Sequence, residues 1–182
     1  MHVRTTALEG VLIIEPQSFG DDRGFFLETY NKRAYAGDAG LDVEFVQDNH
    51  SRSCRGVLRG LHFQERNPQG KLVRVARGAV WDVAVDIDPV SSTFKQYVAI
   101  ELNEENKVQV YIPPGYAHGF CVLSAVADLE YKCTDFYHSE DAKGIAWDDP
   151  EIDIEWPIDS PLLSEQDQSN PGLAEYLKSR MS

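Results

Sequence analysis

Short apolar segments recur along the chain and are separated by clusters of glycine, proline, aspartate and asparagine. In the middle of the chain, Trp81, Val83 and Val85 alternate with Asp82 and Ala84, which is the two-residue period of a strand with one face buried. Such segments follow one another roughly every 8–12 residues, with turn signals between them. The pattern predicts an all-β sandwich or closed barrel of antiparallel strands rather than alternating strands and helices.

The same pattern gives the expected positions of the elements. We expect strands at residues 11–15, 25–30, 43–49, 72–76, 79–87, 97–102, 107–112, 120–123 and 129–136. Turns are expected at residues 19–24 and 113–119, the second of which carries His118. Short helices are expected at residues 31–41 and 171–178. With no linker or repeat in 182 residues, the chain is expected to form a single domain, residues 1–182.

Composition and charge restrict what the protein can bind. Hydrophobic residues make up 42% of the chain and charged residues 26%, as in an ordinary globular protein. The formal net charge of -13 disfavours general binding to nucleic acid or to an anionic membrane, so an anionic ligand needs a local cluster of cations. Three widely spaced cysteines, no apolar signal sequence and no long apolar run lead us to expect a cytoplasmic protein.

One stretch, RGVLRGLHFQERNPQGK at residues 55–71, combines cationic groups with a strand pattern. Arg59, His62 and Lys71 stand among apolar residues that suit a strand, and a strand that lines a polar cavity can carry both kinds. Histidine titrates near neutral pH, and the neighbouring cations could hold an anion. We therefore expect an active site for an anionic substrate here. Regular alternation would place Arg59 and His62 on opposite faces. Either a bulge at Gly60 or a position of Arg59 at the barrel rim would resolve this conflict.

Other candidates are weaker when judged by residue type alone. No two histidines stand two positions apart, as a His-x-His pair of metal ligands would, so we expect no metal site. Tyr131 and Tyr137 share one face of a strand if the alternation continues, and they either fill the barrel or serve as a proton donor and a flat stacking surface. Asp167, in a polar segment, by itself indicates only a solvated carboxylate.

Several strings occur in order along the chain: FGDDRGFFLETYN, FVQDNHSRS, GVLRGLHFQ, GKLVRV, VWDVAVDI, IPPGYAHGF and LLSEQDQ. Together, over about residues 11–167, they resemble the dTDP-4-dehydrorhamnose 3,5-epimerase family. The resemblance implies a cupin-type jelly-roll barrel of antiparallel strands with a few short helices, a homodimer, and no metal or organic cofactor. It also implies inversion of C3 and C5 of dTDP-4-dehydro-6-deoxy-glucose, which gives dTDP-4-dehydro-L-rhamnose for cell-surface polysaccharide.

The resemblance assigns catalytic roles to four side chains. Both C3–H and C5–H are α to the C4 ketone, so each proton can be removed if the enolate is stabilised. His62 is implied as the base and Asp167 as the carboxylate that orients it. Lys71 is implied to stabilise the C4 oxyanion, and Tyr131 to deliver a proton from the opposite face.

The resemblance also assigns substrate contacts, and it is imperfect at one end. Positions implied to bind the nucleotide-sugar are Phe19, Arg23, Phe26, Glu28, Gln47, Asn49, Arg59 and His118, with Tyr137 stacking on thymine. This chain has Ser139, Ala142 and Gln166 where the family usually has proline, glutamate and lysine. Glu140 or Asp141 could replace the glutamate after a small shift. These changes concern the nucleotide end and leave the chemical residues intact.

Two other functions are compatible with the same residues. One is an epimerase that inverts only C3 or only C5 of a related dTDP-4-keto-deoxysugar. The other is a cupin-like sugar-nucleotide binding protein without catalysis, which the joint presence of His62, Lys71 and Tyr131 disfavours.

Overall fold

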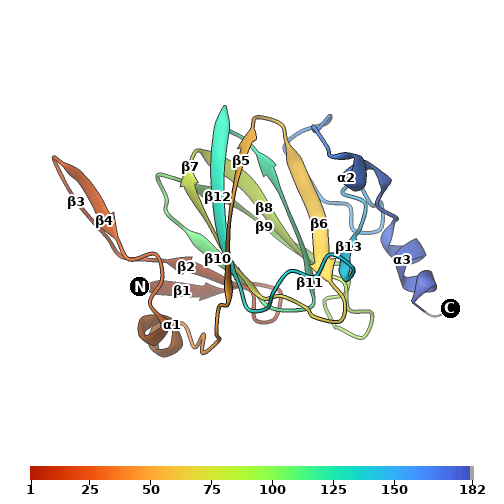
Figure 1. The fold of residues 1–182 in the computed structure, drawn as a ribbon, viewed down its shortest axis with the longest axis horizontal. Coiled ribbons are helices and arrows are strands. Elements are labelled where there is room, and N and C mark those ends of the chain that lie inside the picture. The colour runs from red at the N-terminus through yellow and green to blue at the C-terminus, as the bar shows by residue number, and fades with distance from the viewer. Residues whose placement is uncertain (181–182) are drawn as a thin grey trace.

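The alternating pattern sorts most strands into two antiparallel sheets that pack face to face (Figure 1). The computed structural model describes residues 1–180. The six-stranded sheet has the order β1 (His2–Thr5), β2 (Leu12–Glu15), β10 (Gln109–Ile112), β7 (Lys71–Arg77), β12 (Val126–Cys133) and β5 (Gln47–Cys54). The five-stranded sheet has the order β13 (Ala142–Gly144), β6 (Leu58–Gln64), β11 (Tyr116–Val122), β8 (Ala79–Asp86) and β9 (Tyr97–Asn103).

The remaining elements lie outside these two sheets. Strands β3 (Ser18–Asp21) and β4 (Gly24–Leu27) form a separate hairpin that projects from the body of the molecule, at the far left of Figure 1. The helices are α1 (Lys32–Asp38), α2 (Glu165–Ser169) and α3 (Leu173–Ser179). None of the helices within residues 1–180 is long and apolar enough to cross a membrane.

The main core lies between the two sheets. Val73 and Leu129 of the six-stranded sheet belong to the same buried cluster as Ala84 and Phe120 of the five-stranded sheet. This is the burial that the two-residue period predicts, because every second side chain of each strand points inward. The expected jelly-roll architecture is therefore confirmed.

Both outer faces are partly covered as well. The C-terminal segment lays Leu173 and Tyr176 of α3 against Leu61 and Val83 on the outer face of the five-stranded sheet. Helix α1 buries Tyr35 against the outer face of the six-stranded sheet, near its β1 edge. Because α2 immediately precedes α3, this packing also places α2 beside β6, as Figure 1 shows.

Several predicted elements differ from the structure. The turn expected at residues 19–24 is mostly strand, because residues 18–21 form β3 and pair with β4, and the strand expected at residues 25–30 ends at Leu27. The strand expected at residues 43–49 begins only at Gln47, because Phe45 packs with the α1 cluster instead of extending the sheet. The strand expected at residues 129–136 ends at Cys133, because Thr134 leaves the sheet to exchange hydrogen bonds with Gly70. His118 lies in β11 and not in a turn, since the turn is complete before Tyr116.

Candidate active site

A β-bulge places Arg59 and His62 on the same face of β6. In the pairing with β11, His62 is opposite His118 and Arg59 is opposite Phe120. Two residues of β6, Gly60 and Leu61, therefore face the single residue of β11 that lies between His118 and Phe120. Gly60 has a φ of 133°, and a Cβ there would lie 2.6 Å from the neighbouring backbone, so glycine is required. Of the two alternatives that the sequence left open, the structure has the bulge. Arg59 remains exposed and donates from Nε to Ser53 Oγ of β5 at 3.1 Å.

His62 is hydrogen-bonded to Asp167, the carboxylate that the family resemblance implied. Its Nε2 lies 2.5 Å from Oδ1 of Asp167, which stands in α2 and is 4% exposed. Ser164, the N-cap of α2, donates from Oγ to the other carboxylate oxygen at 2.9 Å. Burial alone would raise the pKa of Asp167, but the hydrogen bonds from His62 and Ser164 and the charge of His62 outweigh it, and the pKa is lowered. With Nε2 donating to Asp167, Nδ1 of His62 is left as the basic nitrogen.

Lys71 places a cation inside the open end of the barrel. Burial lowers the pKa of its ammonium group, whereas the nearby Cys133 and Asp82 act in the opposite direction. Asp82 is 1% exposed and accepts a hydrogen bond from His118 Nε2 at 2.9 Å. The pair is buried, and His118 is not among the side chains that line the cavity beside His62. The sequence did not single out Asp82, because the alternation in β8 puts the apolar Trp81, Val83 and Val85 on the opposite face, and in the structure that apolar face lies outward under the C-terminal segment.

Tyr131 lies on the facing sheet. On β12 it pairs with Asn49 of β5 on one side and with Val73 of β7 on the other, and it packs against the main core. Burial, with smaller contributions from Cys133 and Tyr137, raises the pKa of the Tyr131 phenol, and the charge of Arg59 opposes this shift. The phenol therefore keeps its proton at neutral pH.

These groups meet in one cavity of about 370 Å³. It is lined by Gln47, Asn49, His62, Phe63, Gln64, Gln69, Lys71, Tyr131, Tyr137, Ala142, Lys143 and Gln166. Tyr137 follows the end of β12, so it does not share a strand face with Tyr131 as the sequence suggested, yet it reaches the same cavity. Its backbone N–H donates to Gln47 Oε1 at 2.9 Å, and Gln47 donates to Asn49 at 3.0 Å.

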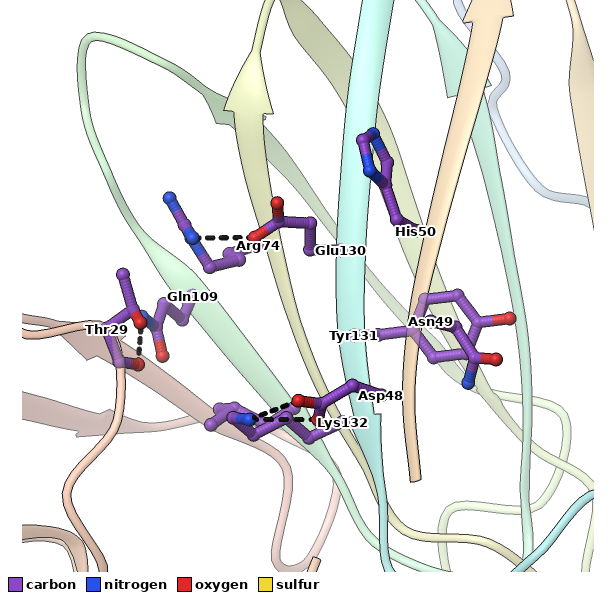
Figure 2. Close-up of a pocket in the computed structure, with 10 residues that line it drawn as sticks. Thr29, Asp48, Asn49, His50, Arg74, Gln109, Glu130, Tyr131 and Lys132 are labelled. Carbon is purple, nitrogen blue, oxygen red and sulfur yellow. Dashed lines mark hydrogen bonds and ion pairs between the residues drawn. The ribbon is translucent and has the colours of Figure 1, made fainter. Parts of the chain in front are cut away.

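A second pocket, of about 340 Å³, lies on the outer face of the six-stranded sheet (Figure 2). Its cations are already paired, Arg74 with Glu130 at 2.7 Å and Lys132 with Asp48 at 2.9 Å. In Figure 2, Tyr131 points away from these groups, toward the other side of β12. The outer pocket thus offers no unpaired lysine or arginine to an anion, and the cavity beside His62 is the stronger candidate.

Comparisons with known proteins identify the family to which this chain belongs. The family model for dTDP-4-dehydrorhamnose 3,5-epimerase matches residues 5–175. The chain belongs to this family. A dTDP-4-dehydrorhamnose 3,5-epimerase from Pseudomonas aeruginosa is 54% identical over 96% of this chain and 97% of its own length.

Two further comparisons bear on the reaction. The Legionella pneumophila dTDP-6-deoxy-D-glucose-3,5-epimerase, solved in complex with dTDP-4-keto-L-rhamnose, is 49% identical with a TM-score of 0.92, over 95% of this chain and 93% of that one. A dTDP-4-dehydrorhamnose 3-epimerase from Streptomyces niveus is 39% identical over 96% of this chain and 85% of its own length. The family thus also has a relative named for C3 alone.

The hairpin residues implied by the family resemblance lie apart from the cavity. Phe19 and Phe26 are 57% and 70% exposed on β3 and β4, and they line only a hollow within the hairpin itself. Arg23 pairs with Asp21 of the same hairpin. Glu28, just after β4, accepts a hydrogen bond from Asn31 at 3.1 Å. Within one chain, these side chains do not join His62.

Two of the positions that depart from the family pattern lie at the cavity. Ala142 and Gln166 both line the cavity. Asp141 does not replace the missing family glutamate, because it is 1% exposed and its carboxylate accepts from the backbone N–H groups of Arg66 and Asn67. Glu140 points to solvent, with its side chain 70% exposed.

We predict a pH-dependent contribution of Asp141 to stability. Burial would raise its pKa, but the hydrogen bonds from Arg66 and Asn67 outweigh burial and lower it from 3.8 to about 2. A lowered pKa stabilises the folded state above the ordinary value, and this contribution is lost as the pH falls through about 2. Asp141→Asn should therefore destabilise the protein in urea unfolding at pH 7, and the difference from wild type should shrink toward pH 2.

The matched control is Glu140→Gln, an exposed carboxylate one position away. It should change the free energy of unfolding by less than about 0.5 kcal/mol at either pH. An Asp141→Asn difference that stayed constant with pH would contradict the assignment.

Proposed function

We propose that this chain is a dTDP-4-dehydrorhamnose 3,5-epimerase that inverts C3 and C5 of dTDP-4-dehydro-6-deoxy-glucose. The proposed reaction removes a proton α to the C4 ketone and returns one to the opposite face of the sugar ring. Every proton and charge in the proposal is assigned to a side chain of this chain, so it calls for no cofactor. The free thiols of the three cysteines fit the proposed cytoplasmic location.

One observation carries the proposal: the base and the acid stand on facing sheets. His62 is on β6 of the five-stranded sheet, and Tyr131 is on β12 of the six-stranded sheet, across the same cavity. A sugar ring between them would present one face to Nδ1 of His62 and the other to the phenol. That arrangement supports inversion rather than simple exchange.

The steps balance without another reactant. Nδ1 of His62 takes the C3 or C5 proton, and the electron pair of that C–H bond moves into the enolate, whose charge develops on the C4 oxygen. Lys71 supplies positive charge there, and Asp167 stabilises the imidazolium. The phenolic O–H of Tyr131 then gives its proton to the carbon from the other side. Proton exchange with water restores His62 and Tyr131.

Substrate binding is assigned to the mouth of the cavity. Tyr137, 58% exposed, offers a ring face for thymine, and Arg59 offers a guanidinium group for the diphosphate. Gln47, Asn49 and His118 are proposed as further contacts, the last requiring movement because it is buried against Asp82.

A homodimer would bring the hairpin residues to a substrate. Phe19, Arg23 and Phe26 lie on a projecting hairpin, and their chemistry suits a nucleotide diphosphate. Because they are separated from the cavity of their own chain, we propose that they, with Glu28 at the stem, serve the cavity of a second copy.

Replacing His62 by alanine tests the base. His62→Ala should abolish solvent-deuterium exchange at both C3 and C5, because one base serves both carbons, with rates falling by about 10²–10⁴-fold. NMR of the substrate in D2O follows each carbon separately. Loss at only one carbon would refute the single-base assignment, and exchange at only C3 in the wild type would favour the C3-only function.

Replacing Tyr131 by phenylalanine tests the acid. Tyr131→Phe keeps the ring and its packing but removes the proton. Deuterium should still enter through His62, whereas formation of the L-configured product should fall sharply in the same NMR assay. A normal rate of epimerisation would mean that Tyr131 only fills the barrel.

Mixing two inactive variants tests the shared site. Arg23→Ala and His62→Ala should each lack activity alone, because each damages every site. After denaturation and refolding together in equal amounts, about a quarter of the wild-type activity should return, since half of the dimers are mixed and each has one intact site. If Arg23 served its own chain, mixing would restore nothing.

A further inference from the structure

Gln64 holds the segment that carries Tyr137. It lies on β6 two positions after His62, faces the cavity, and is 5% exposed. Its Oε1 accepts the backbone N–H of His138 at 2.7 Å, and its Nε2 donates to the backbone carbonyl of Phe136 at 3.1 Å. The two residues that flank Tyr137 are therefore bonded to one buried side chain.

The same amide reaches a second loop. Nε2 of Gln64 also donates to the carbonyl of Asn67 at 2.7 Å, so both of its hydrogens are used within the protein. Gln64 lines the cavity, yet it has no donor left for a substrate. Gln64 is therefore suited to hold the backbone around Tyr137 rather than to donate to a substrate.

The support matters because Tyr137 has little else to fix it. The residue lies beyond the end of β12, its ring is 58% exposed, and no aromatic stacking partner is found for it within residues 1–180. Its direction is thus set through the backbone, by Gln64 on both flanks and by Gln47 at its own N–H. Fixing a ring before binding reduces the ordering cost of stacking on a base.

We propose that Gln64 is a positioning residue for nucleotide binding, acting through Tyr137. The inference rests on the proposed role of Tyr137 as the surface on which the base stacks. Gln64 would then set the affinity for the nucleotide without taking part in proton transfer at the sugar.

A double-mutant cycle tests the inference, with thymidine diphosphate as the probe and calorimetry as the measurement. Tyr137→Ala should weaken binding roughly tenfold or more, as loss of base stacking does. Gln64→Met, similar in size but without hydrogen bonds, should weaken it roughly tenfold. The double variant should bind no more weakly than Tyr137→Ala alone. With the full substrate, Gln64→Met should raise KM and leave kcat close to the wild-type value.

Gln109→Met is the matched control. Gln109 is another buried glutamine, 1% exposed, which bonds Tyr35 at 2.8 Å and Thr29 at 3.0 Å, away from Tyr137. Any effect of Gln109→Met on the binding free energy should simply add to that of Tyr137→Ala. Should Gln64→Met fail to fold, Gln64→Glu keeps an acceptor for His138 but replaces both donors by a carboxylate oxygen that repels the carbonyl groups of Phe136 and Asn67, and its effect should likewise vanish in the Tyr137→Ala background.

The possible outcomes distinguish the positioning role of Gln64 from the stacking role of Tyr137. Independent effects of Gln64 and Tyr137 variants, or a fall in kcat with KM unchanged, would overturn the positioning role while leaving stacking intact. Unchanged binding in Tyr137→Ala would refute stacking and the inference with it. Neither outcome touches the epimerase chemistry, which the deuterium exchange of His62→Ala tests separately.

Discussion

Lys71, a half-buried cation, sets the requirements for the open end of the barrel. An ammonium group taken out of water is costly unless opposite charge or hydrogen bonds compensate it. Cys133 and Asp82 oppose the lowering of the Lys71 pKa by burial, and His118 in turn donates to Asp82. Val73 on β7 and Phe120 on β11 follow Lys71 and His118 by two positions, and both belong to the hydrophobic core. The next inward-facing side chain of each strand is thus apolar, so the same strands build the polar site and the core beside it.

The base depends on packing outside the barrel. Asp167 stands 105 positions after His62 and reaches it because α3 buries Leu173 and Tyr176 on the outer face of the five-stranded sheet. The N-cap of α2 then fixes the carboxylate with a hydrogen bond of its own. Hydrophobic burial on one face of the sheet therefore positions a proton-transfer group on the other.

Local patterns predicted most of the strands and offered the bulge as one of two alternatives, and contacts distant in sequence decided the rest. The two-residue period placed β8 correctly, and Gly60 predicted how Arg59 and His62 could share a face. The end of β12 could not be predicted, because it depends on hydrogen bonds between Thr134 and Gly70, and these come together only in the folded sheet. For the same reason no role for Gln64 could be predicted from the sequence, because its partners belong to two loops.

The two ends of the cavity differ in how they respond to pH. In the proposed reaction, His62 changes its charge and Lys71 keeps its own, although burial lowers the pKa of the Lys71 ammonium group. At the proposed nucleotide end, Gln47 and Gln64 hold the Tyr137 segment through neutral amides, and the pKa of Asp141 is about 2. The Tyr137 segment is therefore held by two neutral amides, and the Asp141 carboxylate stays ionised far below neutral pH, so the proposed stacking surface should keep its geometry around neutral pH. Under the proposed mechanism, the pH dependence of turnover should then originate at the groups around the sugar and not at the nucleotide.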